Sequence, residues 1–308
     1  MTFSHVPVLY EETLDSLCIR PGGVYFDGTL GGGGHSSGIA ERMQGKGLLL
    51  GSDLDPNALA AAGDRLKQYS VETRQFRSNF KNFTALLKEA GVDGVDGVLL
   101  DLGVSSHQLD EKSRGFSYQA EAPLDMRMSD TGMTAADVVN TYTEEELRRV
   151  LWEWGEEKNA RAIARVIVQE REGHPITTTT ELCACISRAF GGRYTDKNPA
   201  RRTFQALRIE VNGELCGLRE VLFEMADALR PGGVLSVITF HSLEDRIVKQ
   251  AFKDMIDGCT CPKDFPVCTC GFEQKVDLVF RKPVTASERE LQENPRARSA
   301  KLRAVKRR

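Results

Sequence analysis

A glycine-rich turn directly after a short apolar run constrains the fold of this chain more than any other segment. The apolar run ends at Asp27, and glycines stand at positions 28, 31, 32, 33 and 34. Glycine permits positive φ and lets a ligand approach the backbone closely. His35 then opens a stretch with a helical pattern, whose first N–H groups would face such a ligand. The segment predicts a strand, a tight turn and a helix beside a bound molecule.

A second apolar run, residues 47–51, leads to the acidic pair Asp53 and Asp55. In dinucleotide-type folds, an acidic residue about 20 positions after the glycine turn holds a ribose. Asp53 is our candidate for this role, although the spacing alone does not separate it from Asp55. The glycines and the carboxylate therefore support each other.

Strand and helix patterns alternate over residues 1–109, and the buried run 95–100 ends at Asp101. This alternation predicts a doubly wound α/β sheet with right-handed crossovers. Asp101 would then lie at the carboxyl end of a strand, where open α/β sheets bind their ligands. A ligand-binding role is accordingly favoured over a purely structural one for this residue.

The pattern becomes helical over residues 110–217, with capping pairs at Thr143/Glu146 and Thr178/Glu181. Strand patterns return over residues 218–308, where the segment after Pro295 is predicted to form a charged edge strand. We therefore expect an all-helical domain, 110–217, inserted into an α/β domain made of 1–109 and 218–308.

Composition limits the function classes. The 308 residues are 41% hydrophobic and carry a formal net charge of −3, which argues against a uniformly basic nucleic-acid coat. A local basic patch is still expected at the end, because residues 296–308 hold seven basic and no acidic residues. No apolar run approaches the ~18–20 residues of a membrane span, and no signal-like segment opens the chain. A cytoplasmic protein without membrane contact is predicted.

Three cofactor classes could use the glycine turn. A P-loop needs GxxxxGK[ST], which is missing, and a nicotinamide site prefers GxGxxG. S-adenosylmethionine sites combine a glycine-rich first loop, an acid after the second strand and a polar motif after the fourth, and all three features occur here. The remaining alternative is a tight strand-to-helix turn without a ligand.

The motifs also resemble one family along nearly the whole chain. The resemblance is carried by the segments DGTLGGGGHS (27–36), SDLDP (52–56), LLDLGVSSHQLD (99–110), RGFSY (114–118), PLDMRM (123–128), RTFQALRIEVNGEL (202–215), TFHSLEDRIVK (239–249) and NPRARSAKLR (294–303). They are similar to those of the RsmH (MraW) family. The resemblance implies a Rossmann-like class I methyltransferase with an inserted helical domain. It further implies transfer of a methyl group from S-adenosylmethionine to N4 of a cytidine in the decoding region of 16S ribosomal RNA.

The resemblance assigns cofactor contacts to seven residues: Gly33, Gly34, His35, Asp53, Phe80, Asp101 and Gln108. Asp53 would bind the ribose hydroxyls and Phe80 would stack on the adenine. Each of three assignments has a structural alternative. Phe80 could pack in the core, His35 could be only a helix-start residue, and Gln108 could be a solvated loop residue. For catalysis, Asp101 is the candidate acceptor of an N4 hydrogen, with Ser105 and His241 as second choices.

RNA would be held mainly through its phosphates, and the target base would leave its stack. Arg201, Arg202 and Arg208 fall on one predicted helix, and Arg296 and Arg298, with Lys301, form a second basic group. For each arginine, a solvated or salt-bridged surface position is as well supported by the sequence as a role in RNA binding. The expected partner is 16S rRNA or the small ribosomal subunit, and the resemblance leaves room for a homodimer.

Four cysteines form a CxC-x6-CxC pattern: Cys259, Cys261, Cys268 and Cys270. Four thiols this close in sequence can surround one tetrahedral zinc ion. Free thiols or a redox-labile pair are the alternative, since the resemblance requires no metal here.

Two other function classes stay open from the sequence. One is a ribosome-assembly factor that keeps the cofactor fold without catalysis, which the intact glycine turn, Asp53 and Asp101 argue against. The other is a methyltransferase that acts on DNA or on a small molecule.

Overall fold

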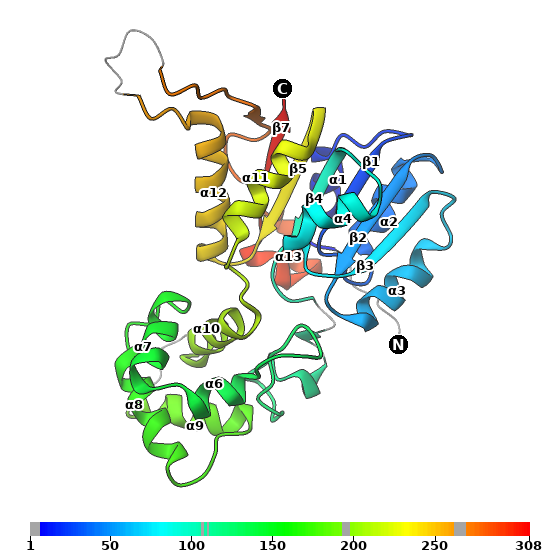
Figure 1. Ribbon diagram of the computed structural model, residues 1–308. Helices are drawn as coiled ribbons and strands as arrows, with labels where there is room; N and C mark the ends of the chain where they lie inside the picture. The colour runs from blue at the N-terminus through cyan, green and yellow to red at the C-terminus, as the bar shows by residue number, and fades with distance from the viewer. Residues whose placement is uncertain (1–6, 106–107, 110, 193–197, 262–268) are drawn as a thin grey trace. The chain divides into compact units, whose positions relative to one another are not determined.

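The computed structural model describes residues 7–105, 108–109, 111–192, 198–261 and 269–308. The chain divides into two compact units (Figure 1). Met1–Gly103 and Gly217–Arg308 form what we call the sheet unit, and Val104–Cys216 form the helical unit. In the described residues, we find no helix that combines the length and the apolar character needed to cross a bilayer.

The sheet unit contains a seven-stranded sheet in the order β3-β2-β1-β4-β5-β7-β6. Its strands are β1 (Val24–Asp27), β2 (Leu48–Asp53), β3 (Glu72–Arg77), β4 (Val95–Asp101), β5 (Leu229–Thr239), β6 (Val276–Leu278) and β7 (Lys301–Arg307). The first five strands of this order are parallel, whereas β7 runs antiparallel to β5 and β6. The predicted doubly wound α/β fold is confirmed.

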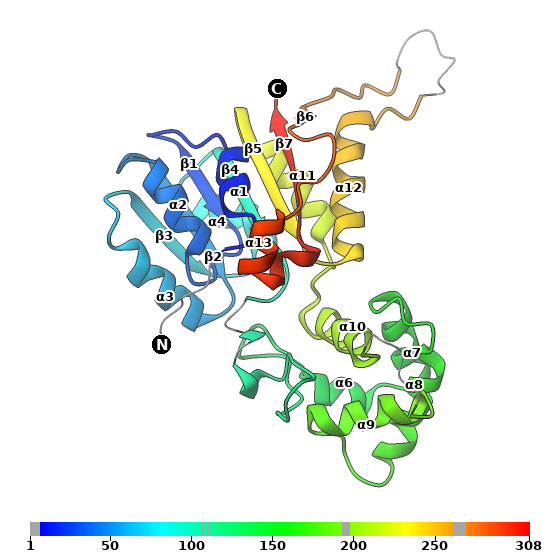
Figure 2. The same ribbon diagram turned by 180° about the vertical axis from the view of Figure 1, so that it is seen from behind.

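Helices cover both faces of the sheet (Figures 1 and 2). They are α1 (Tyr10–Ser16), α2 (Gly34–Arg42), α3 (Pro56–Leu66), α4 (Phe83–Glu89), α11 (Leu218–Ala228), α12 (Ser242–Asp257) and α13 (Glu288–Glu293), with 3-10 turns η1 (Phe80–Asn82) and η3 (Pro295–Ser299). Leu14 of α1, Leu17 directly after it, and Ile39 of α2 pack with Tyr25 and Leu49 of the sheet into one buried cluster. Burial on both faces explains the apolar character of most of β4, where Val95 and residues 98–100 are fully buried.

The prediction that the last strand lies at the sheet edge is wrong. β7 lies between β5 and β6, with Leu235 opposite Val305 and Leu278 opposite the same residue on the other side. Two of its basic side chains are tolerated there because they reach one carboxylate of α12. Asp245 accepts from Arg303 Nε at 2.7 Å and from Lys301 Nζ at 2.9 Å.

The helical unit is built from α6 (Ala135–Thr141), α7 (Glu144–Glu153), α8 (Ala160–Arg171), α9 (Thr179–Ala189) and α10 (Ala200–Asn212), with a 3-10 turn η2 (Lys112–Arg114). The capping boxes predicted for the starts of α7 and α9 are both present. Leu147, Val150 and Leu151 of α7 lie in one buried cluster with Ile163 and Ile167 of α8. The amphipathic pattern of these helices therefore marks their core-facing sides.

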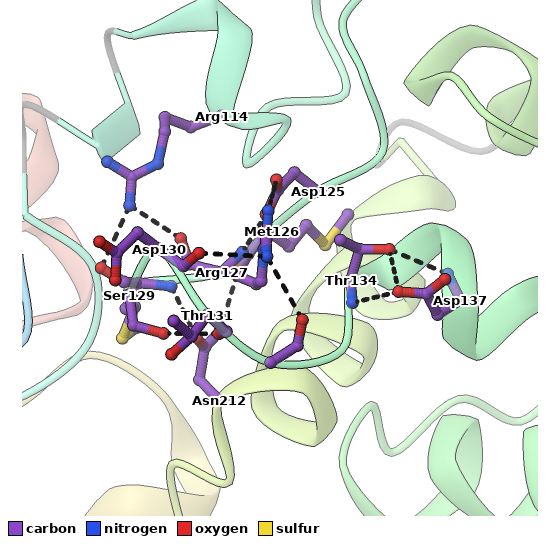
Figure 3. Close-up of polar contacts among 12 residues, drawn as sticks. Arg114, Asp125, Met126, Arg127, Ser129, Asp130, Thr131, Thr134, Asp137 and Asn212 are labelled. Carbon is purple, nitrogen blue, oxygen red and sulfur yellow. Dashed lines mark hydrogen bonds and ion pairs between the residues drawn. The ribbon is translucent and has the colours of Figure 1, made fainter.

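A polar network fixes the loop between residues 123 and 134 of the helical unit (Figure 3). Arg127 binds both oxygens of Asp125, at 2.8 and 2.7 Å, and Arg114 donates to the backbone carbonyls of residues 127 and 128. Asn212 of α10 donates to the carbonyl of Met126, which has a φ of +62°. These contacts hold a left-handed residue in place and give the PLDMRM segment one defined shape.

Candidate active site

The glycine turn joins β1 to α2. Gly33 has a φ of +74° and is the N-cap of α2, with its N–H donated to Leu30 O at 2.8 Å. A Cβ on Gly33 would lie 3.1 Å from Ala62 Cα of α3, and one on Gly34 would lie 2.6 Å from the ring of Pro7. Gly33 is therefore favoured by its positive φ and by the limited space beside α3, and Gly34 by the limited space beside Pro7.

The structure separates the roles of Asp53 and Asp55. Asp55 is buried and caps α3 by accepting from Asn57 N at 2.9 Å. Asp53, at the carboxyl end of β2, accepts from Gly31 N at 2.8 Å and from Asp55 N at 2.9 Å, and is only partly buried. A carboxylate offers about four acceptor positions. Asp53 is thus oriented by the glycine turn and can still accept from a ligand, while burial raises its pKa.

Asp101 ends β4 next to the glycine turn, and its N–H is donated to Thr29 Oγ1 at 2.6 Å. About a quarter of its side chain (26%) is exposed, but Oδ1 is buried and has no hydrogen-bond partner among the described residues. Burial, followed by the charges of Asp27 and Glu244, raises the pKa of Asp101 to about 8. An unpaired carboxyl of this kind is typical of a functional site rather than of a structural ion pair.

Asp27 lies at the carboxyl end of β1 and is 2% exposed. It accepts from Ser36 Oγ at 2.7 Å and from Thr29 N at 3.1 Å. Burial nevertheless raises its pKa to about 6. The carboxyl ends of β1, β2 and β4 thus place three carboxyls with raised pKa values along one edge of the sheet.

His35 is buried on the first turn of α2, and its Nε2 lies 3.1 Å from the carbonyl of Val8. A carbonyl only accepts, so Nε2 carries the hydrogen and Nδ1 is an acceptor in the neutral ring. Nδ1 lies 3.7 Å from Asp101 Oδ2, too far for a hydrogen bond. Burial lowers the pKa of His35 to about 4, so the ring is neutral at pH 7.

The other two expected cofactor contacts lie in different units. Phe80 opens η1 in the sheet unit and is partly exposed, and a Cβ on Gly28 would lie 2.9 Å from its Cβ. The partial exposure of Phe80 favours a role in stacking on a ligand over a position in the core. Gln108 lies in the helical unit and is buried, with its Oε1 accepting from Ser105 N at 3.0 Å. The alternative of a solvated glutamine is therefore wrong.

His241 and Glu244 form a capping box at the start of α12. Glu244 is 1% exposed, and its Oε2 accepts from Phe240 N at 2.9 Å and from His241 N at 3.2 Å. His241 Nε2 lies 3.1 Å from the other oxygen of Glu244. His241, a second choice for the proton acceptor, thus serves as a helix cap.

The predicted RNA-binding arginines differ in their surroundings. Arg201 and Arg202 are exposed on the first turn of α10. Arg208, two turns later, binds both oxygens of Glu214 at 2.8 and 2.9 Å and is only 17% exposed. This pairing favours the salt-bridge alternative for Arg208. Arg296 and Arg298 are exposed on η3 of the sheet unit.

Three of the four clustered cysteines belong to the described residues. The Sγ atoms of Cys259, Cys261 and Cys270 all lie within 4.8 Å of one another. Cys268 lies outside the described residues.

This geometry can be compared with known proteins. The sequence model of the MraW methylase family matches residues 2–308. The chain belongs to this family. A ribosomal RNA small subunit methyltransferase H from Heliobacterium mobile is 52% identical over 99% of both chains. The protein of that name from Fusobacterium nucleatum is 50% identical over 98% of this chain and 96% of its own, and that from Brevibacillus brevis is 51% identical over 99% and 98%.

Within this MraW methylase chain, sequence reasoning missed two carboxyls. The sequence indicates Asp27 only as the end of a strand, although its position beside the glycine turn is also compatible with a site residue. Glu244 resembles any first-turn acid of a helix, and only the packing of α12 against the sheet reveals that it is buried and electrostatically linked to Asp101.

Proposed function

We propose that the protein transfers a methyl group from S-adenosylmethionine to N4 of a cytidine in the decoding region of 16S rRNA. Family membership supports the methyl transfer, and the relatives' name supports small-subunit ribosomal RNA as the substrate. The position on the base rests on the sequence resemblance.

The observation that carries the proposal is the buried Oδ1 of Asp101 at the carboxyl end of β4, for which the described part of the chain offers no hydrogen-bond partner. Leaving a buried carboxyl oxygen without a donor costs roughly 1–3 kcal/mol, which a structural role would not explain. A bound ligand that supplies a hydrogen-bond donor or a positive charge would remove this cost. We therefore expect Asp101 to contact either the cofactor or the target amine.

The residues at this edge fit S-adenosylmethionine by their chemistry. Asp53 and Asp101 are acceptors, which suit ribose hydroxyls and a positively charged ligand, whereas pyrophosphate would meet carboxylates of its own sign. Gly33 and Gly34 bring the start of α2 to the same edge, and Phe80 offers a partly exposed ring for adenine. Gln108 stays a prediction from the resemblance.

When bound, S-adenosylmethionine supplies an electrophilic methyl group on a positively charged sulfur. The N4 amine of cytosine is a weak nucleophile because its lone pair is delocalised into the ring. Asp101 accepts an N4 hydrogen and so raises the electron density on nitrogen as it becomes cationic. With a pKa of about 8, Asp101 is mostly protonated at pH 7 in the unliganded protein, and the positive charge of bound S-adenosylmethionine would favour the ionised form that accepts the hydrogen.

His35 lies beside Asp101 but does not pair with it. Its neutral Nδ1 faces Asp101 Oδ2 at 3.7 Å and presents a lone pair rather than a hydrogen. The ring therefore makes no hydrogen bond to this carboxyl, which stays open to the substrate. Holding N4 in line with the methyl–sulfur bond would add a proximity effect that can reach several kcal/mol.

The test uses purified protein, small ribosomal subunits and S-adenosylmethionine with a labelled methyl group. We expect label in N4-methylcytidine on nucleoside mass analysis, no transfer with Asp101→Ala, and normal transfer with Asp64→Asn, an exposed carboxyl of α3. Wild-type transfer by Asp101→Ala would remove Asp101 from the mechanism.

The same assay separates the competing functions. Label in another nucleoside would refute the N4 assignment, and label in DNA or a small molecule alone would refute the rRNA substrate. An unchanged level of N4-methylcytidine in the 16S rRNA of cells lacking the protein would refute the proposal as a whole.

A further inference from the structure

The connection between α12 and β6 carries a group of thiols that the methyl transfer does not use. Cys259 and Cys261 follow α12 directly, and Cys270 precedes β6. Helix α12 begins at the carboxyl end of β5, and its 16 residues extend over about 24 Å. In Figure 1 the connection accordingly emerges at the end of α12 that lies away from the carboxyl edge of the sheet.

The spacing of the sulfur atoms fits a shared metal ion. All three Sγ atoms lie within 4.8 Å of one another, and those of Cys259 and Cys270 are 3.6 Å apart. With Zn–S bonds of about 2.3 Å, tetrahedral geometry separates neighbouring sulfurs by about 3.8 Å. A disulfide would hold them at about 2.05 Å. The cluster thus has the size of a thiolate metal site and contains no bond between these two sulfurs.

The backbone around the thiols is arranged to support negative sulfur. Thr269, eight residues after Cys261, donates its N–H to the Cys261 Sγ at 3.2 Å. Its hydroxyl lies 3.5 Å from the same sulfur. Hydrogen bonds to the ligand atom are the common way in which proteins orient metal ligands and tune their basicity. Gly271, with a φ of +68°, turns the chain directly after Cys270.

We propose that Cys259, Cys261 and Cys270 bind a structural zinc ion that ties the two ends of the connection between α12 and β6. Three thiolates select a soft, tetrahedral divalent ion over magnesium or calcium, which prefer oxygen ligands. The fourth ligand is outside this set of residues. The ion cross-links the end of α12 to the chain that enters β6, and it takes no part in methyl transfer. The inference is independent of the proposed function.

The experiment uses the full chain without a metal-binding tag, purified in a phosphine reductant and without chelator. Elemental analysis should give one zinc per chain. Exchange to cobalt(II) should then produce the strong thiolate-to-metal absorption and the intense visible bands of a tetrahedral site, and X-ray absorption should give at least three sulfur ligands.

Variants locate the site. Cys261→Ser and Cys270→Ser should each lose zinc to a chelator at least tenfold faster than the parent protein. Cys18→Ser, which changes an exposed cysteine of the same unit, should retain zinc like the parent. Unchanged circular dichroism and methyl transfer in the variants would show that the sheet unit is folded.

Several results would overturn the proposal. The first is less than a tenth of an equivalent of zinc, with no thiolate-to-cobalt absorption. The second is a chemical state without metal, shown by cysteines that all react as free thiols or by a mass lower by two hydrogens, which reveals a disulfide. The third is equal zinc loss from Cys18→Ser and Cys261→Ser. A second readout needs no variant: chelation should open the connection between α12 and β6 to protease, while the rest of the chain stays intact.

Discussion

The replacement Asp101→Asn should change how the stability of the protein depends on pH. Asn has nearly the same shape as Asp but cannot ionise. In the folded protein the pKa of Asp101 is raised to about 8, and in the unfolded chain it is about 3.9. Below pH 4 both states carry the proton, so the carboxyl has no pH-dependent effect. As the pH rises, the unfolded chain releases its proton first and folding becomes less favourable until about pH 8.

The size of this effect follows from the difference in pKa. Each pH unit between the two values costs about 1.4 kcal/mol of unfolding free energy. From pH 5 to pH 8 the wild type should lose up to about 4 kcal/mol through this group, against a total stability of about 5–15 kcal/mol. The Asp101→Asn protein should not lose it. His35, whose pKa falls from about 6.5 in the unfolded chain to about 4 in the folded protein, contributes in the opposite direction over part of this window. Its contribution is common to both proteins and cancels in their difference.

The assay is urea unfolding of both proteins at several pH values from 5 to 9, without cofactor. Far-UV circular dichroism follows the whole chain, whereas fluorescence follows the helical unit, because Trp152 and Trp154 both lie there. The stability difference between variant and wild type should increase with pH and level off above about pH 8. Asp64→Asn, which removes an exposed carboxyl of lowered pKa, should give a constant difference. A constant difference for Asp101→Asn as well would refute the reasoning.

Two further predictions test the glycine turn and the basic surface. Gly33→Ala should lower the unfolding free energy by about 1–3 kcal/mol more than Gly22→Ala, because both have positive φ but only the Cβ at 33 meets α3; equal losses in urea unfolding would contradict this. Replacing Arg201 and Arg202 by Ala should weaken binding to small-subunit RNA and reduce its salt dependence while sparing cofactor binding, whereas Arg208→Ala should destabilise the helical unit by unpairing a carboxylate. If the double variant binds RNA as tightly as the wild type at every salt concentration, Arg201 and Arg202 do not contribute to RNA binding.

Local sequence patterns predicted the parts of the fold that depend on neighbouring residues. The apolar runs ending at Asp53 and Asp101 correspond to β2 and β4, since strands buried on both faces need continuous apolar sequence. The capping pair Thr143/Glu146 marks the first turn of α7 because its hydrogen bonds lie within four residues. The carboxyl ends of parallel strands meet at one edge, so two site carboxyls followed from these assignments.

Features that depend on distant residues could not be predicted in this way. The place of β7 inside the sheet depends on Asp245 of α12, which lies more than fifty residues earlier and receives Arg303. The burial of Glu244 and Gln108 depends on packing that leaves no periodic signal. Asp53 and Asp55 are equivalent by spacing, and only the cap that Asp55 provides to α3 distinguishes them.

The interior position of β7 also affects how shortened forms of the chain would behave. Removing residues 301–307 would not trim a basic tail. It would expose the ladder edge of β5 at Leu235, Val237 and Ile238, all of which are buried in the intact sheet. An exposed apolar strand edge is a template for pairing with another chain. Truncated protein should therefore aggregate, and reduced RNA binding by such a form would report misassembly rather than the loss of a basic surface.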